Sequence, residues 1–306
     1  MAAETPPNDE FSSDEYDLTV VVACVEAART IDRCLDALER TCADIRAQVV
    51  VAVDGSMSHT VARLRDSRPA IEILQYPAGT LVPSLWAAGL HVAQGRAVAF
   101  TLGQMVVSET WARGLLRGLR RSHGVGGPLM LARDVGITDA AVFFLRYSAF
   151  LPAMMPEGLV AGEIAGDNAA YRREPLDQYR PSVNEGFWEV DFHRRLRASG
   201  FTLGATAEAT SMFCGGTRFS EIARHRYEHG HLFGRARVQR GETRLRILTA
   251  APLVPFALAW RAARRVSRQP ALRLRFALSL PIFLALAGCW AAGEARGAVQ
   301  RHAGGC

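Results

Sequence analysis

An alternation of apolar strands and amphipathic helices between residues 18 and 120 constrains this chain more than any other feature. Each strand-like segment is followed by a segment whose apolar residues have helical spacing. Strands that alternate with helices form a parallel sheet with right-handed crossovers. No GxGxxG follows any of these strands, which disfavours a dinucleotide-binding fold. The sequence therefore predicts an α/β protein with a Rossmann-like, mostly parallel sheet, whose strands are "LTVVVACV", "AQVVVAVDGS", "AIEILQYP" and "RAVAFTL".

The strand "RAVAFTL" ends in Leu102, Gly103 and Gln104. Ligands of open α/β sheets bind just beyond the carboxyl ends of the strands, so a site is expected there. Two helix boundaries are also predicted from capping preferences. Gly95 is expected to cap the helix before this strand, and Ser108 is expected to begin the helix after it.

Arginine and apolar residues are concentrated in the C-terminal part of the chain. Residues 1–234 hold 23 arginines against 28 carboxylates, whereas residues 235–306 hold 13 against two. Two apolar runs, 247–260 and 276–292, flank a segment with six arginines. A spanning helix needs about 20 apolar residues, and the minimum is about 17. We expect the first run to enter a membrane without crossing it. The second is expected to be interfacial, re-entrant or a single span.

An acidic body with a basic, apolar tail predicts contact with anionic membrane lipids and argues against nucleic acid as a partner. The six cysteines form no CxxC pair and no metal-ligand spacing, which favours a reduced, cytosolic setting. Residues 1–16 are expected to be a disordered leader, residues 17–240 the folded domain and residues 241–306 a membrane-associated helical tail. Deletion of 244–306 is expected to release a soluble domain.

Six blocks in order resemble the family 2 glycosyltransferases, which have the GT-A fold of nucleotide-diphospho-sugar transferases. The resemblance covers about residues 18–235, and the tail ending "WAAGEARG" is similar to the membrane-associated end of many bacterial members. The blocks are "TVVVACVEAARTIDRCLDAL", "VVVAVDGSMSHT", "AAGLHVAQGRAVAF", "AGDNAAYRREPL", "WEVDFHRRLRASGF" and "RHRYEHGHLFGR".

The resemblance implies transfer of a sugar, with inversion, from a nucleotide-sugar donor to a hydroxyl group. It assigns the general base to Glu189, with Asp191 as a neighbour that orients it and Glu185 as a weaker substitute. Asp54, in the family's Asp-Asp-Gly-Ser turn, is expected to contact a uridine-type nucleotide. The remaining implied donor-binding residues are Cys24, Glu26, Gly103, Gln104, Arg224, Tyr227 and His229, and the implied acceptor-side residues are Asn168, Tyr171 and Arg172.

The chain departs from the family where the family binds its divalent cation. Leu102 and Gln104 occupy the two aspartate positions of Asp-x-Asp, and Val53 replaces the first aspartate of the earlier turn. Mg²⁺ and Mn²⁺ prefer carboxylate ligands, so no metal ligand is predicted although the family implies a divalent cation. Basic residues of the "RHRYEHGHLFGR" block are then expected to meet the charge of the diphosphate.

Two functions remain open from the sequence. The first is a glycosyltransferase at the cytoplasmic face of the cell membrane, acting on a lipid-linked or cell-envelope glycan acceptor. The second is a catalytically silent GT-A domain that acts as a membrane-bound binding module. The missing aspartates favour the silent domain, whereas the retained Asp54, Glu189 and basic block favour the enzyme.

Overall fold

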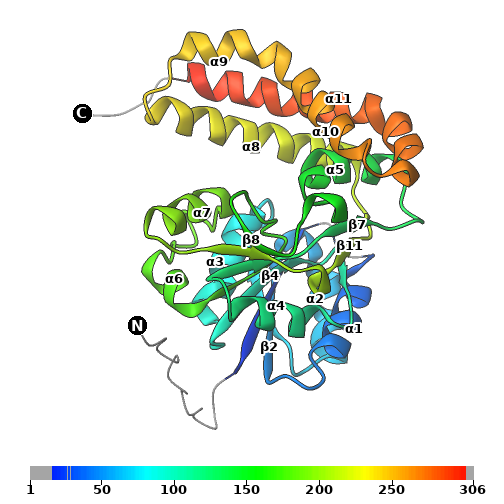
Figure 1. Cartoon of the computed structure of the whole chain (residues 1–306), viewed down its shortest axis with the longest axis vertical. Coiled ribbons are helices and arrows are strands. Elements are labelled where there is room, and N and C mark those ends of the chain that lie inside the picture. Colours follow the sequence, from blue (N-terminus) through cyan, green and yellow to red (C-terminus); the bar gives the residue numbers. More distant parts are fainter. Residues whose placement is uncertain (1–15, 26, 28, 301–306) are drawn as a thin grey trace, which may run out of the picture.

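The computed structural model describes residues 16–300 except 26 and 28. The predicted leader, apart from Tyr16, and the predicted donor contact Glu26 lie outside the described residues. A twisted sheet with helices on both faces forms the body, and a layer of helices from the C-terminal part lies across one end of it (Figure 1).

The main sheet has eight strands in the order β3-β2-β1-β4-β9-β6-β10-β8. β1 lies between β2 and β4 and is parallel to both, while β9 runs antiparallel between β4 and β6. A small second sheet has the order β5-β11-β7. The strands are β1 Leu18–Cys24, β2 Ala47–Asp54, β3 Glu72–Tyr76, β4 Ala97–Leu102, β5 Met105–Val107, β6 Gly124–Gly126, β7 Leu129–Leu131, β8 Gly158–Val160, β9 Asn168–Arg172, β10 Leu203–Ala205 and β11 Ser211–Phe213.

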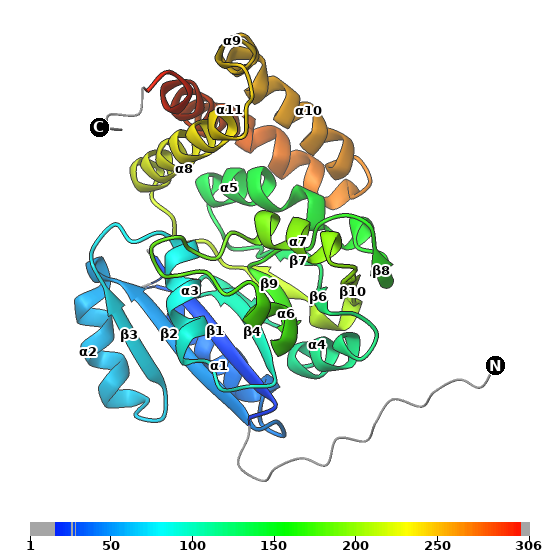
Figure 2. The same ribbon diagram turned by 90° about the vertical axis from the view of Figure 1, so that its left-hand side faces the viewer.

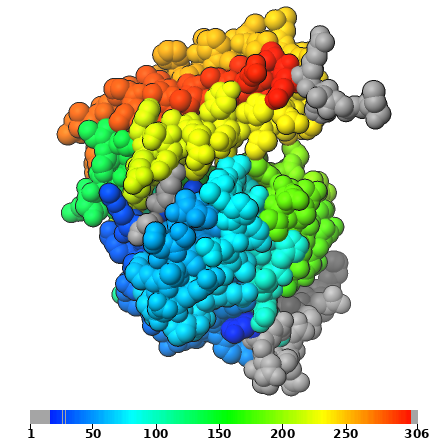
Figure 3. All heavy atoms as spheres, turned by 180° about the vertical axis from the view of Figure 1, so that it is seen from behind, coloured from blue at the N-terminus to red at the C-terminus, as the bar shows by residue number. Residues whose placement is uncertain are grey.

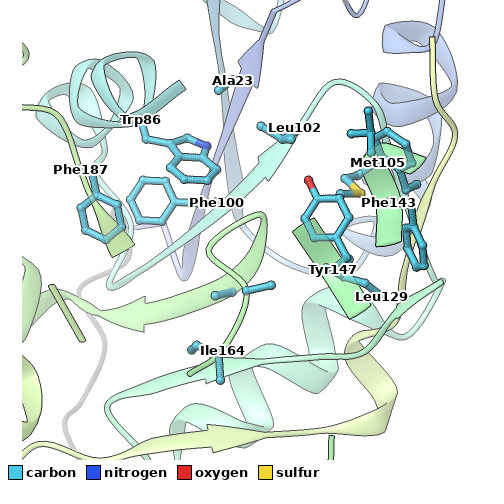
Figure 4. Packing of buried hydrophobic residues seen from close by; sticks show 14 of the residues in the cluster. Ala23, Trp86, Phe100, Leu102, Met105, Leu129, Phe143, Tyr147, Ile164 and Phe187 are labelled. Carbon is cyan, nitrogen blue, oxygen red and sulfur yellow. The ribbon is translucent and has the colours of Figure 1, made fainter. Parts of the chain in front are cut away.

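Helices cover both faces of the main sheet, which is why β1 is buried along its whole length. Val20 and Val22 of β1 face α1, α2 and α4, whereas Val21 and Ala23 face α3 and the aromatic core. On that second face Trp86 and Phe187 pack around Phe100 (Figure 4). The helices of the body are α1 Ile31–Thr41, α2 Ser58–Ser67, α3 Val82–Val92, α4 Trp111–Leu119, α5 Ile137–Tyr147, α6 Arg173–Gln178 and α7 Glu189–Ala198.

This architecture confirms the predicted α/β class with a mostly parallel sheet and C-terminal helices. The two helix caps were predicted wrongly. α3 ends at Val92 with Ala93 as its cap, and Gly95 instead donates its N–H to Thr19 Oγ1 at 2.8 Å. α4 is capped by Thr110, while the Ser108 hydroxyl donates to the Glu208 carbonyl at 2.9 Å. Both residues make tertiary hydrogen bonds that local capping rules do not include.

The C-terminal layer consists of α8 Phe219–Gln239, α9 Arg244–Ala250, α10 Val254–Val266 and α11 Pro270–Val299. α11 packs along α8 and on α5, which joins the layer to the body (Figure 2). In the space-filling view the layer lies as a slab across the end of the body (Figure 3). The arginine-rich segment 261–275 is helical except for the residues between α10 and α11.

Two pairs of glycines allow α8 and α11 to approach at backbone distance. A Cβ on Gly230 or Gly234 of α8 would lie 2.1 Å from a backbone oxygen of α11. A Cβ on Gly293 or Gly297 of α11 would lie 2.0–2.1 Å from a backbone oxygen of α8. The sequences "GHLFG" and "GEARG" therefore provide matching flat surfaces with no room for a side chain at any of the four positions.

We expect Gly293→Ala to destabilise the protein by about 1–3 kcal/mol, because the added methyl group must push α8 and α11 apart. Gly288→Ala is the matched control, since a Cβ at Gly288 on the same helix has no neighbour within 4 Å. The control should be neutral or up to about 1 kcal/mol more stable, because alanine favours the helix over glycine. Urea unfolding of the two variants measures the difference, and equal stabilities would contradict the close packing.

Candidate active site

A cavity of about 430 Å³ lies between the carboxyl ends of the parallel strands and the C-terminal layer. The ends of β1 and β4 form its floor, and α5, the start of α7 and one face of α8 form its walls. This is the position at which open α/β sheets bind ligands. The polar and titratable residues that line it are Thr80, Gln104, Arg146, Tyr147, Asp167, Glu189, Thr217, His225, Arg226 and His229.

Two carboxylates and one guanidinium meet on the side of the cavity near β9. Asp167, buried just before β9, accepts a hydrogen bond from Arg146 Nη2 at 2.9 Å and another from the Tyr147 hydroxyl. Glu189 begins α7 and packs against Gly166, where a Cβ would lie 3.0 Å from the Glu189 side chain. The glycine therefore brings the second carboxylate close to the Asp167–Arg146 pair.

The surroundings of Glu189 raise its pKa to about 7. Burial is the largest cause because it disfavours the charged carboxylate, and the negative charge of Asp167 adds to it. The backbone N–H of Glu189 and the Arg146 guanidinium act in the opposite direction. A carboxyl group with a pKa near neutrality can both accept and release a proton at physiological pH, which suits a general base.

α8 presents one face to the cavity, at helical spacing, with Ile222, His225, Arg226 and His229. Burial lowers the pKa of His229 to about 3, and the charges of Arg226 and Arg146 add to that effect. Burial also lowers the pKa of His225. Both imidazoles are therefore neutral at physiological pH, and Arg226 is the charged group that α8 brings to the cavity.

The carboxyl end of β4 lacks ligands for a divalent cation. Leu102 and Gln104, at the two positions where the resemblance implies aspartates, line the cavity. Within residues 16–300, excluding 26 and 28, no group of three or more His, Cys, Asp or Glu side chains is placed to hold a metal ion. The residues present therefore do not fit the divalent cation that the resemblance implies.

The structure separates the predicted donor-binding residues into two groups. Gln104 and His229 line the cavity. Cys24 is buried on the face of β1 that α1 covers, where burial raises its thiol pKa to about 12, and Gly103 packs against its sulfur. Arg224 and Tyr227 lie on the outer side of α8, where Arg224 faces Glu228 at 3.9 Å and Tyr227 is 41% exposed.

Asp54 lies at the carboxyl end of β2 and is buried. Its Oδ1 accepts the Ser56 N–H at 2.7 Å, and its Oδ2 accepts the Gly79 N–H at 2.5 Å. The carboxylate therefore fixes the loops after β2 and β3. The loop after β3 borders the cavity through Thr80. Its side chain is not among the cavity-lining groups.

The three predicted acceptor-side residues lie inside the protein, on β9. Asn168 accepts from Trp111 Nε1 at 2.6 Å and donates to two backbone carbonyls. The Tyr171 hydroxyl is hydrogen-bonded to His193 Nε2 at 2.7 Å, and Arg172 donates to the Leu119 carbonyl at 2.7 Å. Their polar atoms hold the sheet to its neighbours, and none of the three lines the cavity.

Asp191 and Glu185, the two carboxylates considered beside Glu189 as the base, do not face the cavity. Asp191 forms ion pairs with Arg194 and Arg195 on the outer side of α7, and Glu185 accepts hydrogen bonds from Ser182 in an exposed turn. Neither lines the cavity. Of the three carboxylates considered from the sequence, the cavity contains Glu189.

Sequence reasoning did not select Arg146 or Asp167, and it considered Arg226 only as one of the basic residues of "RHRYEHGHLFGR" that were expected to meet the diphosphate charge. Arg146 had a signal, because it is the one charged residue within the apolar segment "AAVFFLRYSAF". Asp167 directly precedes the selected Asn168, and Arg226 has the helical spacing of Ile222 and His229. A search for charges on otherwise apolar helix faces would have found Arg146.

No protein-family model and no curated protein sequence matches the chain. Among solved structures it is similar to S. aureus TarS 1-349, with 13% identity, a TM-score of 0.49, and coverage of 71% of this chain and 64% of that one. A TarS 1-349 structure in complex with UDP gives 11% identity, a TM-score of 0.48, and coverage of 89% and 90%.

A third similar structure is glucosyl-3-phosphoglycerate synthase from Mycobacterium tuberculosis, in complex with Mn²⁺, UDP and phosphoglyceric acid. It has 15% identity and a TM-score of 0.46, and the match covers 68% of this chain and 73% of that one. The first TarS match thus spans less than two thirds of its counterpart. At these values the comparisons assign neither donor, metal nor acceptor to this chain.

Proposed function

We propose that the protein is a glycosyltransferase that uses a nucleotide-sugar donor, with Glu189 as its general base. The observation that carries this proposal is the placement of Glu189, with a pKa of about 7, in a cavity at the carboxyl ends of the strands. A module that only binds a ligand has no need to hold a buried carboxyl group ready to accept a proton at this position. Burial and the charge of Asp167 raise this pKa because they destabilise the ionised form of Glu189. A catalytic role explains why a protein would keep a carboxyl group in such surroundings.

In the proposed reaction Glu189 takes the proton from an acceptor hydroxyl as its oxygen attacks the anomeric carbon of the donor sugar. The bond between that carbon and the diphosphate oxygen breaks, and the nucleoside diphosphate leaves with the electron pair. Attack opposite to the leaving group inverts the anomeric centre. Arg146, held by Asp167 at 2.9 Å, orients the site and stabilises the charge that develops.

A screen of nucleoside diphosphates and their sugar conjugates by thermal shift tests this function. A nucleotide at 100 times its dissociation constant should stabilise the protein by about 2.7 kcal/mol. Turnover of the stabilising donor, followed as release of its nucleoside diphosphate in the presence of glycan or glycolipid acceptors, would establish the enzyme. Binding without turnover across all acceptors would favour the silent GT-A module. The leucine at position 102, which cannot ligate a metal ion, favours that alternative.

We further propose that the outer face of the C-terminal layer rests on the cytoplasmic surface of the cell membrane. Two segments, Arg244–Val266 and Pro270–Val299, are long and apolar enough to cross a bilayer by length and composition. However, α11 buries Phe276, Phe283 and Leu286 against the rest of the protein. We infer that α9–α11 lie along the membrane, which would bring the cavity close to a lipid-linked or envelope glycan acceptor.

Apolar and cationic side chains on α10 support this orientation. Leu253, Phe256 and Trp260 are 65–67% exposed. Next to them, a hollow of about 230 Å³ is lined by Met154 and four arginines, namely Arg261, Arg264, Arg265 and Arg268. No carboxylate within the described residues pairs with these four arginines. Exposed apolar residues beside unpaired cations match a surface of anionic headgroups.

We expect the protein to co-sediment with phosphatidylglycerol vesicles and not with phosphatidylcholine vesicles. The double variant Arg264→Glu/Arg268→Glu should weaken binding at least about 30-fold, because each arginine near anionic lipid contributes about 1 kcal/mol. Arg113→Glu, on an exposed position of α4 in the body, is the control and should retain binding. Absence of vesicle binding together with a concentration-dependent dimer would show that a second copy covers this face instead.

A further inference from the structure

Arg226 is a cation without a counter-ion in the wall of the cavity. Its Nε is shielded from solvent and has no hydrogen-bond partner. No carboxylate in the described part of the chain forms an ion pair with it. Arg226 as a whole is half-buried, but its shielded Nε donor has neither water nor protein to bond to, which costs free energy unless a ligand pairs with it. A cation held in this way in a cavity wall is suited to pair with an anion.

The groups around Arg226 increase this cost. Burial and the nearby charge of Arg146 lower the pKa of Arg226 to about 10, so it keeps its proton at neutral pH. Arg146 is balanced by Asp167, and the neighbouring imidazoles of His225 and His229 are neutral. The α8 side of the cavity therefore carries one uncompensated positive charge and two neutral rings that can donate or accept hydrogen bonds.

This charge faces the same cavity as the end of β4, where carboxylates for a divalent cation are absent. Leu102 has no ligand atom, and the amide of Gln104 is a poor substitute for a carboxylate. A diphosphate bound there would need its negative charge neutralised by other groups. A guanidinium does this directly, because its planar donors match two phosphate oxygens at once.

We propose that Arg226, with Arg146 beside it, binds the diphosphate of the donor directly and that donor binding requires no divalent cation. The proposal rests on the proposed use of a nucleotide-sugar donor, but it makes a separate claim about how the phosphates are held. The arginines replace the charge that a cation would supply, and they also stabilise the diphosphate as it leaves.

Calorimetric titration of the full chain with UDP, GDP, ADP and inorganic pyrophosphate tests the proposal, with each titration carried out in EDTA and in Mn²⁺. We expect at least one of these anions to bind in EDTA, with an affinity within about twofold of that in Mn²⁺. Arg226→Met and Arg226→Gln should weaken binding by about tenfold or more, the loss of a charged hydrogen bond. Arg235→Met, an exposed arginine on the same helix, is the matched control.

The melting temperatures of the variants without ligand provide a second measurement. The substitution that weakens anion binding should raise the melting temperature. If Arg226 is an anion-binding group, Arg226→Met removes an unpaired buried charge and should raise the melting temperature without ligand. A lower melting temperature with unchanged anion affinity would show that Arg226 is structural and would overturn the proposal. Binding that requires Mn²⁺ would also overturn it while leaving the proposed transferase intact. Binding of pyrophosphate without any nucleotide would support the anion site and count against the nucleotide-sugar donor.

Discussion

Replacement of Glu189 by glutamine is expected to lower the turnover number about a hundredfold or more while leaving donor affinity nearly unchanged. Glutamine keeps the shape of the side chain but cannot accept the proton of the acceptor hydroxyl, and general-base catalysis contributes factors of about 10²–10⁴. Steady-state kinetics of nucleotide release and calorimetric titration of the donor measure the two quantities. A variant with full activity would remove Glu189 from the mechanism.

The pH dependence of the same variant gives an independent check. Turnover of the wild type should rise with pH through a midpoint near 7, because the base acts only when deprotonated. Because the folded-state pKa lies above the ordinary glutamate value of 4.5, the Glu189 contribution to stability is greatest below about pH 4.5 and declines as pH rises to about 7. Glu189→Gln should therefore lack the rise in turnover and should be more stable than the wild type above pH 7.

Asp167→Asn is expected to lower the free energy of unfolding by about 3 kcal/mol. The variant leaves the Arg146 guanidinium without its carboxylate at 2.9 Å, and removal of one partner of a buried ion pair costs about 3–5 kcal/mol. It should also move the midpoint of the pH–rate profile to lower pH. The negative charge that raises the pKa of Glu189 is gone, while the opposing charge of Arg146 remains.

Asp191→Asn is the control for this variant, because Asp191 forms its two ion pairs at the surface of α7. Surface pairs contribute at most about 1 kcal/mol, so its unfolding free energy should change by less than that amount. Urea unfolding and pH–rate profiles of both variants make the comparison. Equal losses of stability, or an unmoved midpoint in Asp167→Asn, would mean that Asp167 does not control the protonation of Glu189.

The order of the first strands and helices could be predicted because it depends on local periodicity. β1 and β2 are buried on both faces, so each appears in the sequence as a continuous apolar run. The position of Glu189 beside the sheet edge also followed from the order of the blocks. Its raised pKa did not, because burial and the charge of Asp167 arise from packing between β9 and α7.

The prediction of acceptor-side residues shows where sequence reasoning ends. The block "AGDNAAYRR" contains Asp167 and Asn168 side by side, and one of them faces the cavity while the other bonds to Trp111 in the core. A shift of one residue along a strand exchanges the face on which a side chain lies. Register within β9 is set by its antiparallel pairing with β4 and β6, which no local pattern encodes.

Because α8 faces the cavity on one side and α11 on the other, α11 supports the wall of the candidate site. A protein shortened before α9 would expose Gly230 and Gly234 on α8 and would leave Phe144 of α5 without Phe276. The helix that carries Arg226 would then have no partner to hold its orientation. The deletion of 244–306 that is expected to release a soluble domain would therefore also be expected to lower the stability of that domain. An engineer seeking a soluble form would do better to replace exposed residues such as Phe256 and Trp260 than to truncate.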